Sequence, residues 1–326
     1  MGSQGVSVIM PVLNEELHLA EAVAHILDQD YDGPIEVVLA LGPSRDRTND
    51  VAAELATIDS RVRTVDSPTG RTAAGLNAAI ALTQYDVIVR VDGHALIPRD
   101  YVRTGVATLE ATGADNVGGI MAAEGVTDFE KSVAAAMTSW FGVGGAAFHI
   151  GGEAGPALTV YLGCFRKSAI ERVGGFDESM VRAQDWEMNH RIRSTGGEIW
   201  FTPDMKVTYR PRASVRTLAK QYHEYGRWRR EIARRDPSTV SLRYLAPPIT
   251  LVGVSVGTII GLVGLVVGQP AVIVLGFSAP AVYVMASLVA TARATRIEPF
   301  PVWRRLPMVF ATMHASWGAG FLRGPG

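Results

Sequence analysis

The chain has 326 residues, of which 48% are hydrophobic and 19% are charged, a charged share below the quarter that is usual in soluble domains. Its 31 basic and 32 acidic side chains give a formal net charge of −1, which excludes a global positive field for nucleic acid. The only cysteine is Cys164, which excludes an intrachain disulfide and fits a reducing compartment.

The first 92 residues alternate between short apolar runs and helical patterns. Runs rich in β-branched residues predict strands, and the spacing of apolar residues between them predicts helices. The expected strands are 6–12, 35–41, 62–65 and 86–91, and the expected helices start near Asn14 and cover 48–57 and 72–82. This alternation predicts an α/β fold with a Rossmann-like, mostly parallel sheet and helices on both faces.

Polar residues gather where these strands end. In open parallel sheets, ligands bind beyond the carboxyl ends of the strands. Four such ends carry candidate binding residues: Pro11 to Glu15, Leu41 to Asp46, Ser67 to Arg71, and Asp92 to His94. The sequence therefore predicts one site at this edge of the sheet.

Two of these strand ends suit a phosphate group and a metal ion. Arg71 precedes a helix start, where its charge adds to the positive end of the helix dipole, although a solvated surface arginine fits the local sequence equally well. The run VRVDGHALIP, residues 89–98, places Asp92 and then His94 after a strand. A carboxylate and an imidazole can both bind a metal, and imidazole suits transition metals better than magnesium.

Residues 160–204 carry a second candidate group. The run VYLGCF predicts a strand, the turn GGFDES follows, and a helix starts near Asp185 and ends at a pair of glycines. The helix dipole favours an ionised Asp185, which beside Trp186 can accept a proton from a hydroxyl. The alternative is that Asp185 and Glu187 are ordinary acids of a first helical turn.

Charge is distributed unevenly toward the C-terminus. Residues 206–243 hold eleven Lys or Arg against three Asp or Glu, and residues 244–292 hold no charged side chain. The uncharged run fits two membrane spans, near 246–267 and 271–291, although a buried hairpin of a soluble protein is the alternative. Glycines recur about every four residues in the first span, which is typical of a close-packing face: Gly253, Gly257, Gly261, Gly264 and Gly268.

Arginines flank both outer ends of the uncharged run, so the positive-inside rule predicts a hairpin that enters from the cytoplasm and returns there. Residues 306–321 could form a third span or a helix lying at the membrane surface, and we favour the surface helix. Residues 214–235 could form an amphipathic helix on the same surface.

Four motifs in order give the chain a wider resemblance. They are VSVIMPVLNEE, RVDGHALIP, GGFDE followed by QDWEMNHRIR, and YRPRASVRTLAKQYHEYGRWRR. Through them residues 6–230 resemble the family 2 glycosyltransferases of the GT-A fold, most closely the branch typified by succinoglycan-biosynthesis enzymes. The resemblance implies an inverting enzyme that transfers a sugar from a nucleotide-diphosphate donor to an acceptor hydroxyl.

The same resemblance implies a role for each matching residue. Asp185 would be the catalytic base, and Asp92 and His94 would hold a divalent metal, with Mn²⁺ expected over Mg²⁺. The implied donor-binding residues are Pro11, Asn14, Glu15, Arg71, Asp92, Arg227 and Trp228. The implied acceptor-binding residues are Gly163, Trp186 and Tyr209.

Leu41 and Gly42 depart from the family pattern, because many relatives carry there an aspartate that contacts the base. A UDP-sugar is still favoured over a GDP- or dTDP-sugar. Because these acids are replaced, the alternative interpretation is that the chain is a membrane-anchored, non-catalytic binding or assembly subunit. A nucleotidyltransferase is disfavoured because PVLNEELHLAE lacks a glycine-rich loop with Arg and Lys, and a processive synthase would need more spans.

The expected organisation has three parts. Residues 1–205 would form the GT-A catalytic domain, 206–243 a basic segment at the membrane surface, and 244–326 a membrane domain. The catalytic domain would lie on the cytoplasmic side of the cell (inner) membrane, close to the lipid headgroups. The expected partners are membrane lipid and a polyprenyl-linked saccharide acceptor.

Overall fold

The computed structural model describes residues 4–294 and 296–325 and divides them into two compact units. The first unit contains the described residues up to Ala122 together with Gly151–Tyr209. The second contains Ala123–Ile150 and the described residues from Arg210 onward. The boundary predicted after residue 205 falls inside a continuous strand, Ile199–Tyr209, and residues 123–150 join the C-terminal helices rather than the sheet.

The first unit is built on one eight-stranded mixed sheet with the order β3-β2-β1-β4-β7-β5-β8-β6. The strands are β1 Val6–Val12, β2 Ile35–Leu41, β3 Val62–Asp66, β4 Val87–Arg90, β5 Asn116–Ala123, β6 Gly155–Pro156, β7 Tyr161–Arg166 and β8 Ile199–Tyr209. β1 pairs in parallel with β2 and β4, and β2 with β3, as the sequence predicts. β7 then pairs antiparallel with β4 and β5, so the carboxyl end of β4 meets the start of β7.

Helices cover both faces of this sheet. They are α1 Leu19–Leu27, α2 Thr48–Ile58, α3 Thr72–Leu82, α4 Tyr101–Thr112, α8 Lys167–Arg172 and α9 Gln184–Ser194. Apolar side chains of α1 and α4 form one core cluster with the inward residues of β1, β2 and β4. α3 packs against β1, β2 and β3 through small residues such as Ala73, Gly75 and Ala79, which are buried.

Alternation along β4 decides which side chains reach the candidate site. Val87, Val89 and Val91 belong to the core cluster shared with α1 and α4. Because successive residues of a strand point to opposite faces, Arg90 is directed to the other face, and Asp92 follows it in the same phase. An arginine with a 5% exposed side chain therefore lies inside a sheet that is otherwise apolar at this point.

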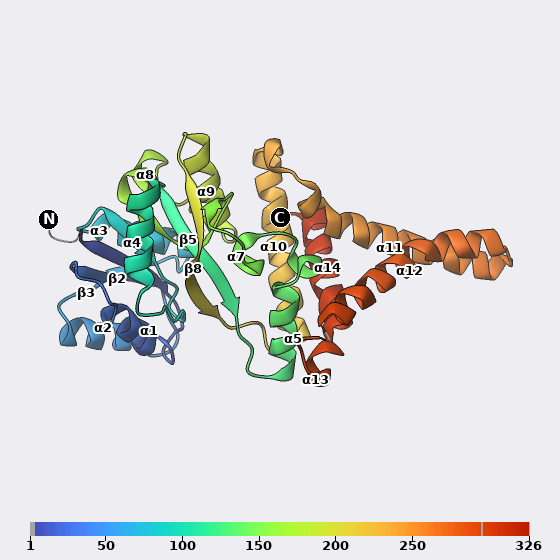
Figure 1. Cartoon of the computed structure of the whole chain (residues 1–326), viewed down its shortest axis with the longest axis horizontal. Helices are drawn as coiled ribbons and strands as arrows, with labels where there is room; N and C mark the ends of the chain where they lie inside the picture. The colour runs from blue at the N-terminus through green and yellow to red at the C-terminus, as the bar shows by residue number, and fades with distance from the viewer. Residues whose placement is uncertain (1–3, 295, 326) are drawn as a thin grey trace. The chain divides into compact units, whose positions relative to one another are not determined.

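The second unit is helical. Its helices are α5 Asp128–Met137, α6 Trp140–Val143, α7 Ala147–Ile150, α10 Val215–Arg235, α11 Leu242–Val267, α12 Pro270–Ala294, α13 Phe300–Trp303 and α14 Leu306–Arg323, with a short 3-10 helix, η1, at Pro237–Thr239. In the described residues, α11 and α12 are the two helices long and apolar enough to cross a membrane. They lie side by side as a hairpin (Figure 1). Most of their large apolar side chains are exposed, which does not fit the buried hairpin of a soluble protein.

Glycines explain how closely the helices of this unit approach. A Cβ added at Gly257 would lie 2.6 Å from the carbonyl oxygen of Gly276, and one at Gly264 would lie 2.6 Å from the amide of Ile273. Gly253, expected on the same face, has nothing within 4 Å, and Gly268 ends α11 with a φ of 67°. α14, whose role at the membrane stays a prediction, packs on α10.

Candidate active site

The centre of the candidate site is Arg90, which the sequence analysis did not single out. Its Nη2 donates to Oδ1 of Asp92 at 2.9 Å, and its Nη1 donates to Oδ1 of Asp185. The carboxylates are 23% and 26% exposed, whereas the arginine side chain is 5% exposed. The structure thus brings together two of the predicted site residues, 93 positions apart in the chain, through a buried cation.

Asp185 is oriented by the turn that precedes α9. Ala183 has a left-handed backbone with φ 60° and ψ 20°, and the helix begins at the next residue. Within that first turn the two acids point to different partners, because Glu187 pairs with Arg191, with an Nε to Oε1 distance of 2.5 Å. Glu187 therefore forms an ion pair within its own helix, as expected for an ordinary acid of the first helical turn. Asp185 instead faces Arg90 at the end of β4.

His94 lies against Glu15 rather than beside a second acid of its own segment. Its Nδ1 is 2.7 Å from Oε1 of Glu15, and the imidazole is half exposed. An ionised carboxylate can only accept, so the ring donates from Nδ1 in this pair, and the neutral ring then has its lone pair on Nε2. Gly93 allows this approach, because a Cβ there would lie 3.0 Å from Cγ of Glu15.

Asn14 and Glu15 also hold two loops of the sheet edge together. Asn14 has a φ of 57°, a value that asparagine tolerates better than most residues. Its Oδ1 accepts from the amide of Arg45 at 2.8 Å, and the amide of Glu15 donates to Oγ1 of Thr48 at 2.7 Å. The loops after β1 and β2 are thereby fixed to one another at the predicted edge.

Arg71 and Pro11 border the first turn of α3. Arg71 is the N-cap residue of that helix, and its own side chain makes no capping hydrogen bond to the first N–H groups. Such groups and the dipole favour an anion, and Arg71 adds a positive charge. Its Nη1 donates to the carbonyl oxygen of Glu178 at 3.4 Å. Pro11 packs against Gly75, where an added Cβ would lie 3.4 Å from the Cβ of the proline.

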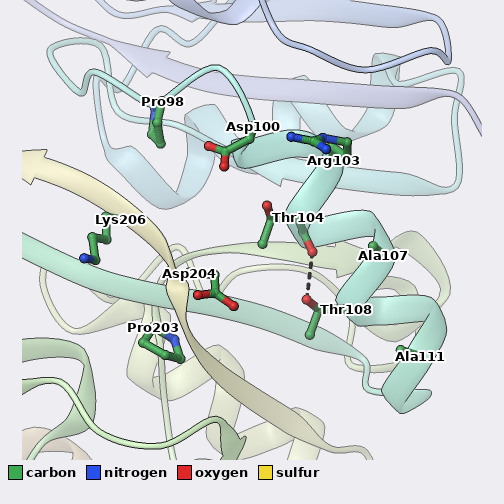
Figure 2. A pocket seen from close by; sticks show the side chains of 10 residues that line it. All are labelled: Pro98, Asp100, Arg103, Thr104, Ala107, Thr108, Ala111, Pro203, Asp204 and Lys206. Atoms are coloured by element: carbon green, nitrogen blue, oxygen red, sulfur yellow. Dashed lines mark hydrogen bonds between the residues drawn. The ribbon is translucent and has the colours of Figure 1, made fainter.

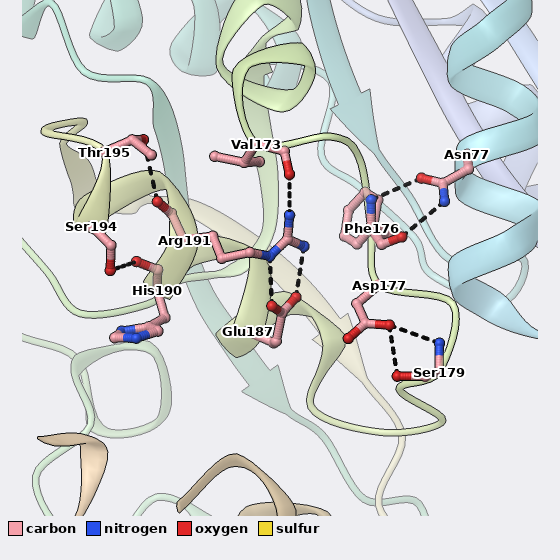
Figure 3. Close-up of polar contacts among 10 residues, drawn as sticks. All are labelled: Asn77, Val173, Phe176, Asp177, Ser179, Glu187, His190, Arg191, Ser194 and Thr195. Carbon is pink, nitrogen blue, oxygen red and sulfur yellow. Dashed lines mark hydrogen bonds and ion pairs between the residues drawn. The ribbon is translucent and has the colours of Figure 1, made fainter. Parts of the chain in front are cut away.

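The loop before Asp185 is fastened to α3 by Asn77 (Figure 3). The side-chain amide of Asn77 accepts from the amide of Phe176 at 2.8 Å and donates to its carbonyl oxygen at 2.9 Å. It also donates to Oε1 of Glu178 at 3.0 Å. The same side chain therefore links α3, the helix that Arg71 precedes, to the loop that leads to Asp185.

The residues predicted to bind the acceptor lie in the first unit, and their roles remain predictions. Gly163 has a φ of 131°, and an added Cβ would lie 2.6 Å from Oδ1 of Asn116. Trp186 stacks on His190 with ring centroids 5.2 Å apart. Tyr209 is the last residue of β8.

Arg227 and Trp228 lie in the second unit, on α10. Arg227 donates from Nε to the carbonyl oxygen of Gly324 at 3.0 Å, and its Nη1 lies 3.1 Å from Oε1 of Glu224. The bond to Gly324 provides a hydrogen-bond donor for a carbonyl at the end of α14. Trp228 is half buried. Their donor-binding roles remain predictions.

The residues present fit a divalent ion that is shared with a diphosphate. Among residues 4–294 and 296–325, no three His, Cys, Asp or Glu side chains gather as a metal-binding group. Asp92 and His94 would therefore supply two ligands, and phosphate oxygens and water the others, as is usual for nucleotide-bound Mg²⁺. Carboxylate and imidazole suit Mn²⁺, and two carboxylates, Asp92 and Asp185, pair with the single guanidinium of Arg90.

A shallow groove elsewhere in the first unit does not belong to this site. It has a volume of about 870 Å³ and lies between α4 and β8 (Figure 2). Its lining includes Asp100, Arg103, Asp204 and Lys206, which mix both charges, and small side chains of α4. None of the predicted site residues lines it.

Comparison with known proteins places the chain among sugar-transfer enzymes. A family model described as glycosyl transferase family 2 matches residues 7–174, a range that ends before Asp185. The succinoglycan biosynthesis protein ExoA of Rhizobium meliloti (strain 1021) is 30% identical over 97% of this chain and 93% of its own length. The dolichyl N-acetyl-alpha-D-glucosaminyl phosphate 3-beta-D-2,3-diacetamido-2,3-dideoxy-beta-D-glucuronosyltransferase of Methanococcus voltae is 23% identical over 98% of this chain and 96% of its own.

A solved structure shares the fold. The mannosyltransferase PcManGT from Pyrobaculum calidifontis, solved in complex with GDP-Man and Mn²⁺, superposes with a TM-score of 0.59 at 21% identity. The match covers 95% of this chain and 85% of that one. The expectation of a GT-A fold with flanking helices and C-terminal apolar helices is thereby confirmed, and the sheet, expected to be mostly parallel, is mixed because β7 pairs antiparallel with β4 and β5.

Proposed function

Because the chain belongs to glycosyl transferase family 2 and is a glycosyltransferase of polysaccharide or glycoconjugate synthesis, we propose that it transfers a sugar, with inversion, from a nucleotide-diphosphate donor to a hydroxyl of a lipid-linked saccharide. The observation that supports this proposal most directly is the group formed by Arg90, Asp92 and Asp185 at the carboxyl end of β4. It holds one carboxylate for the donor side and one for the acceptor side.

Asp185 is the proposed base. An acceptor hydroxyl is a poor nucleophile, and a carboxylate within hydrogen-bond reach increases its reactivity by accepting the proton as the bond to the sugar forms. A single attack on the face opposite to the leaving group inverts the anomeric carbon. Glu187 is not an alternative base, because both of its oxygens bind Arg191.

The leaving nucleoside diphosphate is stabilised on the donor side. Arg71 and the first N–H groups of α3 provide positive charge for phosphate oxygens. Asp92 and His94 are the proposed protein ligands of a divalent ion, with Glu15 orienting the imidazole. When bound, such an ion would neutralise charge that develops on the diphosphate. The presence of Mn²⁺ with the donor in PcManGT supports this part of the proposal.

The nucleotide is proposed only as a class. Pro11 and Asn14 border the place where a nucleoside would lie, but Leu41 and Gly42 supply no acid to bind a base. We favour a UDP-sugar, whereas PcManGT is bound to GDP-Man, so both belong in the test.

The acceptor is proposed from the membrane helices. The exposed apolar faces of α11 and α12 fit a bilayer, and arginines at both outer ends of the hairpin favour a cytoplasmic active site. A site held near the headgroups suits an acceptor attached to a polyprenyl lipid. The inner membrane is the proposed location.

A donor panel tests the proposal. Membranes that contain the protein are incubated with UDP-, GDP- or dTDP-sugars, Mn²⁺ or Mg²⁺ and a polyprenyl-linked saccharide, and nucleoside diphosphate release is measured. We expect release with one donor, an inverted linkage in the product, and more activity with Mn²⁺ than with Mg²⁺. Absence of release with every donor would instead favour a non-catalytic assembly subunit.

A further inference from the structure

The side chain of Arg90 is buried where the sheet is otherwise apolar. Its neighbours Val89 and Val91 are fully buried, and its own side chain is 5% exposed. A buried guanidinium costs several kcal/mol in desolvation unless carboxylates and hydrogen bonds compensate. Two carboxylates compensate its terminal nitrogens, each through Oδ1, one just past the end of β4 and one from α9, whereas the buried Nε has no hydrogen-bond partner in the described part of the chain.

The two contacts differ in how local they are. Asp92 is only two residues from Arg90 and lies just past the end of β4, so this pair is local in the sequence. Asp185 comes from α9, and the first turn of that helix depends on the left-handed Ala183. Arg90 is therefore the residue that fixes a carboxylate of α9 relative to a carboxylate of β4.

The geometry also leaves the proposed base able to act. A carboxylate has two oxygens, and the contact with Arg90 uses Oδ1 of Asp185. The other oxygen can accept a proton while the first holds the orientation. Arginine suits this task better than lysine, because its planar fork can donate to two carboxylates at once.

We propose that Arg90 is a positioning residue, which holds the base Asp185 at a fixed place relative to the donor-side Asp92. The inference rests on the proposed transfer reaction and on Asp185 as its base. It predicts that loss of Arg90 lowers kcat while binding of the donor is kept, because misplacement of a reacting group by about 1 Å costs roughly 100-fold in rate.

The test compares Arg90→Met and Arg90→Lys in the full-length, detergent-solubilised protein. For Arg90→Met we expect kcat to fall about 100-fold while the KM for the donor changes by less than about threefold. The kcat of Arg90→Lys should be about tenfold higher than that of Arg90→Met but still below the wild type, because one ammonium can hold only one of the two carboxylates well. Guanidinium added to Arg90→Ala should restore part of the lost rate, which a purely structural defect would not show.

Arg63→Met is the matched control, since Arg63 lies on β3 of the same sheet and pairs with Glu36 at 3.2 Å, away from the predicted site residues. Its kcat should stay within about twofold of the wild type even if its melting temperature falls. In an Asp185→Asn background, Arg90→Met should change kcat by less than about threefold, because residues that act as a unit are not additive.

Two results would overturn the inference: a kcat for folded Arg90→Met within about threefold of the wild type, or additive losses in the double variant. If Arg90→Met does not fold, Arg90→Lys decides the matter, and a wild-type kcat in that variant overturns the inference. An inactive wild type would instead count against the proposed function itself. The two failures are therefore distinguishable.

Discussion

The pair formed by His94 and Glu15 shows how a histidine can stand where an acid is more common. Donation from Nδ1 to a carboxylate fixes the ring and its tautomer and increases the basicity of the other nitrogen. The family resemblance implies that Glu15 binds the donor. The contact with His94 indicates a further role for Glu15, as the partner of a proposed metal ligand.

Glu15→Gln is therefore expected to weaken Mn²⁺ binding by about 10- to 100-fold, the usual effect of removing such a partner. The binding can be measured without turnover, by electron paramagnetic resonance of free Mn²⁺ in the presence of a nucleoside diphosphate. Glu16→Gln is the control, because Oε2 of Glu16 accepts from the amide of Arg47 at 3.0 Å, on the neighbouring loop. Equal Mn²⁺ affinity in both variants would contradict the role of Glu15.

Asp185→Asn is expected to keep donor binding and to lower kcat by about 100- to 10,000-fold, the range for loss of a general base. Nucleotide binding by calorimetry and product formation by single-turnover assay separate the two effects. Glu187→Gln should show the opposite pattern, with a lower melting temperature and nearly normal kcat, because its partner is Arg191. Normal turnover in Asp185→Asn would remove Asp185 from the proposed role.

At the scale of elements, the contact between Asn77 and the loop at 176–178 connects the donor side to the acceptor side. Asn77→Ala removes three hydrogen bonds, each worth about 1 kcal/mol, and leaves main-chain groups of Phe176 without their partner. We expect faster hydrogen exchange in residues 176–183 and a lower kcat. Asn77→Asp keeps an acceptor for the amide of Phe176 and should have a smaller effect, and unchanged exchange in both variants would show that the loop does not depend on Asn77.

The helical hairpin offers a second element-scale test. Gly276→Ile should separate α11 from α12, because even a Cβ at Gly276 would lie 2.7 Å from main-chain carbon of Ile260. We expect a clear fall in the melting temperature of the detergent-solubilised protein. Gly253→Ile, where nothing lies within 4 Å, should leave that temperature nearly unchanged. Equal effects of the two substitutions would show that close packing of the hairpin does not depend on Gly276.

The elements with strong local patterns could be predicted from the sequence. The strands 6–12 and 35–41 and the helix 72–82 have the bounds that the apolar runs indicate. Each of these elements is an apolar run bounded by turn residues, and this local pattern is sufficient to predict where the element begins and ends. Residues 95–160 could not be assigned in this way, because the contacts that decide their structure come from distant parts of the chain.

Arg90 illustrates the same limit within the candidate site. A signal for it was present, since an arginine in an apolar strand in the same phase as Asp92 needs a compensating partner. The identity of that partner, Asp185, depends on the place of α9 against the sheet, which no local pattern carries. Glu187 was equally ambiguous until its bond to Arg191 was known.

At the scale of the whole molecule, the predicted orientation of the hairpin can be tested with cysteines. Cys164 is fully buried, and burial raises the pKa of its thiol, so it should not react with maleimide in the native protein. Gln269, in the turn of the hairpin, and Ser238 are both exposed on the protein, so only the membrane should decide whether a cysteine at either position reacts. In intact cells, a membrane-impermeant maleimide should label Gln269→Cys, which is predicted to lie outside, but not Ser238→Cys, which is predicted to lie in the cytoplasm. Ser238→Cys should be labelled only after lysis, and the reverse pattern would invert the proposed topology.

The second unit contains α5, which enters it from the middle of the chain. Oγ of Ser132 donates to the carbonyl oxygen of Val302 at 2.8 Å, a contact across 170 positions of the sequence. During synthesis at about 5–20 residues per second, the apolar face of α5 must therefore wait roughly 10–30 seconds for its partners. A ribosome-bound chain exposes Val133 and Met137 throughout that interval, so a chaperone that covers α5 would protect apolar surface until its partners are synthesised.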